Sequence, residues 1–182
     1  MKVSFVLPHA GLTGGIRVVA IYADQLQRRG HQVQCVSVPR RELPLLVKAK
    51  NILAGRPWKK DLRGPSHLDY YPIQHTILDR WRPIVDEDLP DADVVVATWW
   101  ETAEWVAKLS PRKGTKVHLI QHDETQMSNQ QVERVEATWR LPMHRVVVAE
   151  WIAQLGRERY GAGHRRGPQR RRHEPVPCRT AR

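Results

Sequence analysis

The chain has 182 residues, of which 41% are hydrophobic and 27% are charged, and its formal net charge is +11. This length allows one domain with a sizeable core and leaves little room for a second complete domain. The longest apolar runs, such as 94–97 and 146–149, are too short to cross a bilayer, and the N-terminus has no signal-peptide pattern, so we expect a cytoplasmic protein. The two cysteines, Cys35 and Cys178, have no metal-ligand spacing and suggest no disulfide framework.

The positive charge is unevenly distributed. Residues 162–182 contain seven arginines and one glutamate, which leaves 23 basic and 18 acidic residues, a net charge of +5, for residues 1–161. A mildly basic body suits anionic substrates or the anionic inner face of a cell membrane, and a solvated basic face explains it at least as well. No motif for specific nucleic-acid binding is present in the body.

The first predicted elements are a strand at 2–7, a loop closing on Gly14 and Gly15, and an amphipathic helix that ends before Gly30. A helix N-terminus has backbone N–H groups without partners and a partial positive charge, and therefore suits an anion. Two glycines there allow a phosphate to approach the backbone. The pair is favoured as a ligand-facing loop over a simple tight turn, because parallel sheets bind ligands at strand carboxyl ends.

This loop differs from two well-known phosphate-binding motifs. The dinucleotide fingerprint needs G-x-G-x-x-G and an acidic residue ending the second strand, whereas here the loop reads Gly11-Leu-Thr-Gly14-Gly15 and the second strand ends at Val38-Pro39. No P-loop lysine follows the glycines. Nicotinamide and flavin cofactors are therefore disfavoured.

Further elements alternate along the chain. We predict strands at 32–38, 93–98, 115–121 and 145–149, and helices at 42–54, from 99 to about 110, around 132–139 and at 151–160. Residues 56–83 hold four prolines and several aromatic residues, and we predict an irregular excursion with one short helix at 74–81. So long a loop is either functional or an aromatic-anchored surface segment.

The alternation of strands and helices predicts an α/β fold, a Rossmann-like parallel sheet with helices on both faces. Ligands of such sheets lie beyond the strand carboxyl ends. The residues expected there are Gly14 and Gly15, Trp99 and Trp100, and the run 122–124. Three loops therefore converge on one edge of the predicted sheet.

Four segments, in this order, resemble a known family: GGIRVVAIYADQLQRRGHQV, DADVVVAT, HLIQHDE and RVVVAEWIAQLGRERYG. Together they resemble the N-terminal domain of retaining GT-B glycosyltransferases of the family 4-like group, which includes bacterial cell-wall and polysaccharide sugar transferases. The resemblance covers residues 1–161. It implies one half of a GT-B fold, in which this domain binds the acceptor and a second Rossmann-like domain across a cleft binds the nucleotide-sugar donor.

The resemblance also implies roles for individual residues. Gly14 and Gly15, with Thr13 and Arg17, would lie against the donor's diphosphate, and His122 would lie near the reacting sugar. A polar residue that merely ends a strand is an equal alternative for His122. Members of the family usually need no metal for the transfer, and the nucleotide sugar is a substrate, so no cofactor is implied.

The candidate contacts to a saccharide or lipid-linked acceptor are Trp99 and Trp100, with Asp123 and Glu124. Tryptophan rings stack on sugars and on lipids. A buried tryptophan that anchors the following helix is, however, the commoner outcome for either indole.

Residues 162–182, AGHRRGPQRRRHEPVPCRTAR, have no apolar periodicity and depart from the family, which continues with a strand and the donor domain. We interpret them as a disordered tail produced by a frameshift or truncation of the gene, in which case the chain alone binds donor weakly and turns over little. The rival interpretation is a genuine basic tail on a non-catalytic α/β binding module that contacts nucleic acid or anionic membrane.

Overall fold

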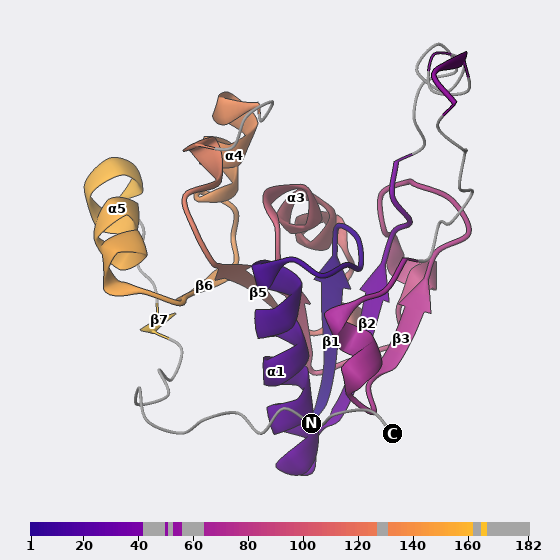
Figure 1. Cartoon of the computed structure of the whole chain (residues 1–182). Coiled ribbons are helices and arrows are strands. Elements are labelled where there is room, and N and C mark those ends of the chain that lie inside the picture. Colours follow the sequence, from indigo (N-terminus) through magenta and orange to yellow (C-terminus); the bar gives the residue numbers. More distant parts are fainter. Residues whose placement is uncertain (42–49, 51–52, 56–63, 127–130, 162–164, 167–182) are drawn as a thin grey trace, which may run out of the picture.

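The computed structural model describes residues 1–41, 50, 53–55, 64–126, 131–161 and 165–166. These residues form an α/β fold in which strands and helices alternate (Figure 1). The strands are β1 (Lys2–Leu7), β2 (Gln32–Ser37), β3 (Gln74–Ile77), β4 (Val94–Ala97), β5 (Thr115–Ile120), β6 (His144–Val147) and the two-residue β7 (Arg165–Arg166). The helices are α1 (Gly14–Arg28), α3 (Trp100–Lys108), α4 (Val132–Thr138) and α5 (Glu150–Tyr160).

Within the described residues the strands form one sheet in the order β3-β2-β1-β4-β5-β6-β7, and every neighbouring pair is parallel. The predicted Rossmann-like parallel sheet is therefore confirmed. From β1 the chain builds outward to β2 and β3, and then returns to the other side of β1 to add β4 through β7. The order thus reverses between β1 and β4, which is where open α/β sheets usually hold their ligands.

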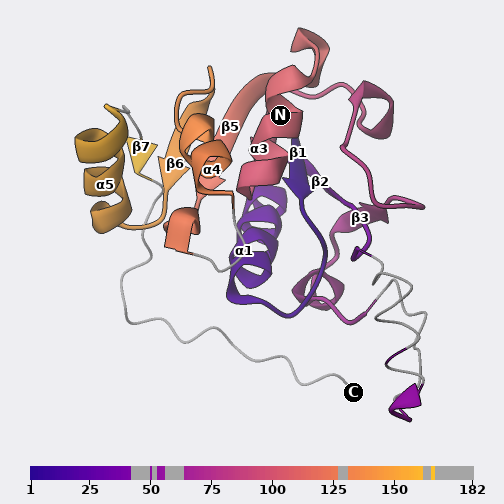
Figure 2. The same cartoon turned by 90° about the horizontal axis from the view of Figure 1, so that it is seen from above.

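Helices cover both faces of the sheet, as the view from above illustrates (Figure 2). On one face, the buried side of α1 packs on alternate residues of β1, including Val3, Phe5 and Leu7. On the other face, α3 packs on Val6 of β1 and on β4. A third cluster joins α4 and α5 to the ends of β5 and β6. This alternation follows from the two-residue period of strand side chains.

One element was predicted wrongly. The segment 74–81 was expected to contain a short helix, but Gln74–Ile77 is the edge strand β3, which pairs with β2. Its side chains alternate between exposed and half-buried, and Ser37 Oγ lies 2.9 Å from Nε2 of His75 across the pair. Thr76 and Ile77 are β-branched and suit a pleated surface, and the pairing with β2, which is remote in sequence, makes this segment a strand.

Two further predictions fall largely outside the described residues. Of the helix predicted at 42–54, only residues 50, 53 and 54 are described. Of the tail predicted to be disordered, Arg165 and Arg166 form β7 beside β6, and Cys178 lies among the residues that are not described. No helix in the described part of the chain has the length and apolar character needed to span a membrane.

Candidate functional site

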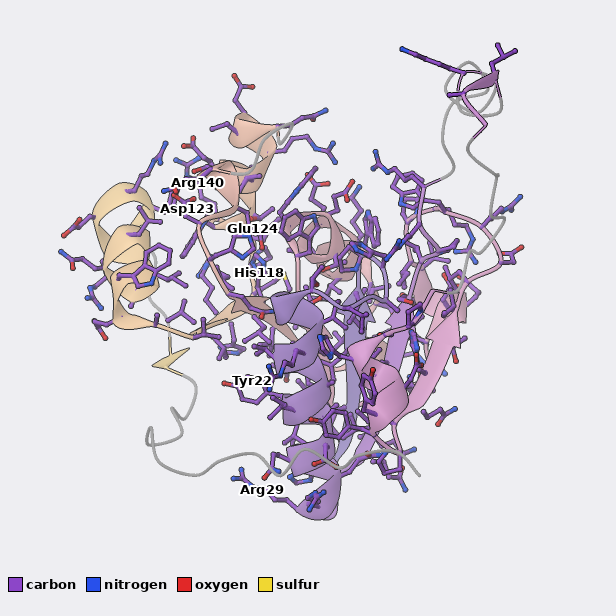
Figure 3. The ribbon with its side chains drawn as sticks, viewed as in Figure 1. Tyr22, Arg29, His118, Asp123, Glu124 and Arg140 are labelled. Atoms are coloured by element: carbon purple, nitrogen blue, oxygen red, sulfur yellow. The ribbon has the colours of Figure 1, made fainter. Side chains whose placement is uncertain are left out.

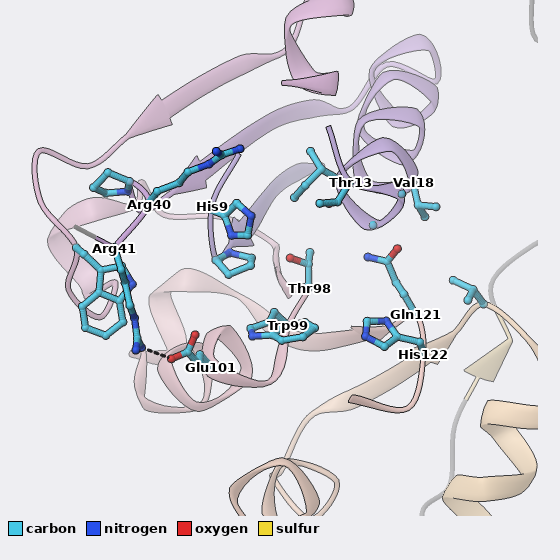
Figure 4. A pocket seen from close by; sticks show the side chains of 17 residues that line it. His9, Thr13, Val18, Arg40, Arg41, Thr98, Trp99, Glu101, Gln121 and His122 are labelled. Atoms are coloured by element: carbon cyan, nitrogen blue, oxygen red, sulfur yellow. Dashed lines mark hydrogen bonds and ion pairs between the residues drawn. The ribbon is translucent and has the colours of Figure 1, made fainter. Parts of the chain in front are cut away.

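A cavity of about 810 Å³ opens at the carboxyl edge of the sheet, at the strand-order reversal (Figure 4). Its walls come from the residues that follow β1, β2, β4, β5 and β6, and from the start of α1. These segments are far apart in sequence, and the parallel register of the strands brings their ends together. The cavity lies within the usual size range of small-molecule binding sites.

The N-terminus of α1 opens into this cavity through Thr13, Gly14 and Gly15. Thr13 precedes the helix with an extended backbone but makes no side-chain capping hydrogen bond, and the first turn contains no acidic residue. A Cβ on Gly14 would meet no atom within 4 Å, and one on Gly15 would lie 3.6 Å from the side-chain amide of Gln121. The Cβ direction of Gly14 is therefore open, that of Gly15 points to the Gln121 side chain, and the anion-binding role of this partly positive helix end stays a prediction.

His122 and Trp99 form the wall on the β5 side of the cavity. Their ring centroids are 5.6 Å apart and the rings are tilted by 40°. Nε2 of His122 is buried and has no hydrogen-bond partner among the described residues. Burial lowers the pKa of His122 and the negative charge of Asp123 opposes this shift, so the imidazole is neutral near pH 7. It can therefore donate from one ring nitrogen and accept at the other.

Hydrogen bonds hold Trp99 in position at the turn from β4 into α3. Thr98 Oγ1 donates to the carbonyl of Val6 at 3.0 Å, which ties the end of β4 to β1. Thr102 Oγ1 accepts from the backbone N–H groups of Thr98 and Trp99, each at 3.0 Å. The turn that presents the Trp99 ring is therefore fixed by neighbouring hydroxyl groups.

An ion pair spans the cavity on the β2 side. Nη2 of Arg41 lies 2.6 Å from Oε1 of Glu101, and the Arg41 guanidinium lies 3.9 Å from the ring centroid of Trp81 (Figure 4). Burial raises the pKa of Glu101, and the positive charges of Arg41 and Arg134 partly offset this effect. Arg41 thus has both a counter-charge and an aromatic surface to pack on.

Arg40 and His9 lie beside this ion pair. Nη2 of Arg40 is 3.4 Å from the position that a Cβ on Gly11 would occupy, so the guanidinium rests against the glycine. Burial, together with the positive charge of Arg40, lowers the pKa of His9. Among the described residues, Arg40 has no carboxylate within ion-pair distance.

The predicted site residues divide into two groups. Thr13, Gly14, Gly15, Trp99 and His122 all line the cavity, whereas the remaining four, Arg17, Trp100, Asp123 and Glu124, are not among its lining residues. Arg17 is exposed on α1. This placement brings the predicted phosphate turn and the predicted reactive histidine to one cavity. It leaves their chemical roles as predictions.

Trp100, Asp123 and Glu124 are buried and belong to the scaffold around the cavity. Figure 3 shows where Asp123 and Glu124 lie. The Trp100 ring is buried beneath the guanidinium of Arg134, 4.6 Å from its centroid. Asp123 accepts hydrogen bonds from the N–H and hydroxyl of Thr125 and from the Gln126 amide. Glu124 accepts from the backbone N–H of Trp100 at 2.8 Å. These contacts do not support the predicted direct contact with an acceptor, because all three side chains face protein.

Sequence reasoning missed twelve of the 17 residues that line the cavity, and six of the twelve have charged, imidazole, indole or amide side chains: His9, Arg40, Arg41, Trp81, Glu101 and Gln121. Four of them end or directly follow a predicted strand, so the rule that ligands lie at strand carboxyl ends would have included them. Trp81 was missed because its segment was assigned to a helix. Glu101 is the second residue of α3, where the sequence pattern gives no signal.

The described residues include no group of histidine, cysteine, aspartate or glutamate side chains arranged to hold a metal ion. Comparison with known proteins adds no further guide, since no family model, curated protein or solved structure matches this chain. The assignment of a function therefore depends on the cavity itself and on the resemblance of the sequence segments.

Proposed function

We propose that this chain is the acceptor-side domain of a retaining glycosyltransferase and that the N-terminus of α1 receives the diphosphate of a nucleotide sugar. The observation that carries the proposal is the uncapped helix start at Gly14 and Gly15, which opens into a cavity at the strand-order reversal. The sequence resemblance supplies the reaction class. In such a reaction a second domain binds most of the nucleotide.

The chemistry requires stabilisation of a departing diphosphate. The bond between the sugar's anomeric carbon and the phosphate oxygen breaks, and its electron pair leaves with the diphosphate. The acceptor oxygen forms the new bond to carbon, and its proton passes to the departing diphosphate, which has gained the electron pair. Backbone N–H groups at Gly14 and Gly15 are suited to the negative charge that develops on the leaving oxygens, because they are fixed before the reaction begins.

His122 and Trp99 suit the reacting sugar. A neutral imidazole can exchange a hydrogen bond with a sugar hydroxyl, and the half-buried Trp99 ring beside it offers an aromatic surface. Both groups lie across the cavity from α1 (Figure 4). The alternative of a non-catalytic module with a nucleic-acid-binding or membrane-binding tail depends on residues 162–182, and none of the contacts described above favours it.

Gly15→Leu tests the proposed phosphate site. The leucine side chain would extend from a Cβ that lies 3.6 Å from the Gln121 amide, and would fill the space between α1 and the end of β5. We expect the dissociation constants of uridine and guanosine diphosphates, measured by calorimetry or by backbone amide NMR, to rise at least about tenfold, which corresponds to about 1.4 kcal/mol.

Gly64→Leu is the matched control. A Cβ on Gly64 meets no atom within 4 Å, and this glycine lies outside the cavity. Its nucleotide affinity should equal that of the unmodified chain. Failure of both diphosphates to bind the unmodified chain, or equal affinities for folded Gly15→Leu and the control, would refute the phosphate site at α1.

A further inference from the structure

Two adjacent arginines follow β2, and their electrostatic surroundings differ. Arg41 is neutralised by Glu101, which is the one carboxylate among the described residues lining the cavity. Arg40 lines the same cavity, is exposed, and makes no hydrogen bond or ion pair with a described residue. The side chains around the cavity therefore leave one positive charge uncompensated, since His9 and His122 are held neutral.

The groups around Arg40 are arranged to meet an oxyanion. The guanidinium lies over Gly11, with Nη2 at 3.4 Å from where a Cβ would be, which is a van der Waals distance. The half-buried His9 ring lies next to it (Figure 4). A guanidinium binds phosphate or carboxylate through two parallel N–H donors, and a neutral imidazole can add a third donor.

This position differs from the one proposed for the donor diphosphate. Gly15 faces Gln121 at the end of β5, whereas Arg40 follows β2. The strands that carry Arg40 and Gln121 are three intervals apart in the sheet, about 14 Å at the usual spacing of about 4.8 Å, while the Arg40 guanidinium itself lies against Gly11 in the loop before α1. The two places belong to different strand ends of one cavity of about 810 Å³, and competition between the two ligands decides whether they share one phosphate.

We propose that Arg40, with His9 beside it, binds a negatively charged group on the acceptor, so that the substrate class is an anionic saccharide or a phosphorylated polyol. This inference rests on the proposed function, because it assigns the donor diphosphate to α1. It adds a specificity-determining residue at the end of β2, which the sequence segments that resemble the family do not include.

Four probes separate the possible sources of the charge. Glucose 6-phosphate carries a phosphate, and glucuronate carries a carboxylate, on the same type of sugar. Glucose is the uncharged reference, and inorganic phosphate lacks a sugar. We expect at least one charged sugar to bind the unmodified chain more tightly than glucose. Arg40→Ala should weaken that ligand roughly tenfold to a hundredfold, the loss expected for a hydrogen bond to a charged group.

Arg29→Ala is the matched control, because it removes one exposed arginine near the opposite end of α1 (Figure 3). It should leave the affinity for the charged sugar within about twofold. No preference for a charged sugar over glucose, or an equal loss in Arg40→Ala and Arg29→Ala, would overturn the inference.

Titration of the same ligand in the presence of saturating uridine or guanosine diphosphate separates this inference from the proposed function. We expect both ligands to bind together, with Arg40→Ala weakening only the charged sugar and Gly15→Leu weakening only the nucleotide. Competition between the two ligands, or an equal loss of both in Arg40→Ala, would assign Arg40 to the donor phosphates and overturn the acceptor role. Binding of the charged sugar without any nucleotide binding would overturn the proposed function, and the acceptor role with it.

Discussion

Glu124 lies behind the wall of the cavity and couples two of its loops. Its side chain is 5% exposed, and Oε2 accepts the backbone N–H of Trp100 at 2.8 Å. Burial raises the pKa of Glu124 to about 8, with a further increase from the negative charge of Asp123, while the hydrogen bond from Trp100 acts in the opposite direction. A buried carboxyl group thus holds the start of α3, which presents Trp99, to the loop that carries His122.

This raised pKa predicts a pH-dependent stability. Between the ordinary value of 4.5 and about 8, the folded chain keeps a proton on Glu124 that the unfolded chain releases. The contribution to stability is therefore fully present below pH 4.5 and is lost as the pH rises through about 8. At about 1.4 kcal/mol per pKa unit, the loss between about pH 5 and about pH 8.5 is at most roughly 4 kcal/mol. Water entry relieves part of it, so we expect at least about 1.5 kcal/mol.

Urea unfolding of the unmodified chain and of Glu124→Gln, at about pH 5 and about pH 8.5, measures the contribution of Glu124 to the free energy of unfolding. Glutamine stays neutral at both pH values, and its amide oxygen can still accept the Trp100 N–H. Other titrating groups, such as the histidines, contribute equally to both proteins and cancel. The unmodified chain should lose stability relative to Glu124→Gln as the pH rises. A difference between the two proteins that stays constant with pH would mean that Glu124 titrates as an exposed carboxyl group.

Two further substitutions test the fold around the site. Gly114→Ala should lower the free energy of unfolding in urea by more than about 3 kcal/mol, because φ is +90° and the new Cβ would lie 2.4 Å from the carbonyl carbon of Asp93. Gly30→Ala, where φ is +83° but the surrounding space is open, should lower it by about 1–2 kcal/mol, and equal losses would contradict the contact at Asp93. His118→Leu should stabilise the chain by about 1–3 kcal/mol. This histidine is 2% exposed, and neither of its ring nitrogens has a hydrogen-bond partner among the described residues. A loss of stability would mean that a buried water satisfies these nitrogens.

The sequence predicts most of the sheet because its central strands are short apolar runs bounded by polar residues. Val94–Ala97 is buried on both faces by α1 and α3, and this produces the continuous apolar run. Strand β3 has no such run, because it is an edge strand of four residues and only His75 and Ile77 are half-buried. Its pairing with β2 depends on contacts that are remote in sequence and that no local period records.

The candidate site is predictable by segment but not by residue. Trp99 and His122 were expected at strand ends and line the cavity, yet their neighbours Trp100 and Glu124 are buried in the scaffold. Where the backbone leaves a strand and turns into a helix, successive side chains take different directions. The rule for parallel sheets fixes the end of the strand, and the geometry of the turn then decides which side chain enters the cavity.

The electrostatic role of a charged residue is even harder to predict from the sequence. Arg40 and Arg41 are adjacent and identical, and the difference between them comes from Glu101, sixty residues away along the chain. Six other arginines in the described part of the chain are also paired with carboxylates, namely Arg28, Arg82, Arg112, Arg134, Arg157 and Arg159. Counting charge along the chain therefore overstates how much is free to attract a ligand. The position of an unpaired cation, beside a cavity that holds a single carboxylate among its described lining residues, is the more specific indication of an anionic substrate.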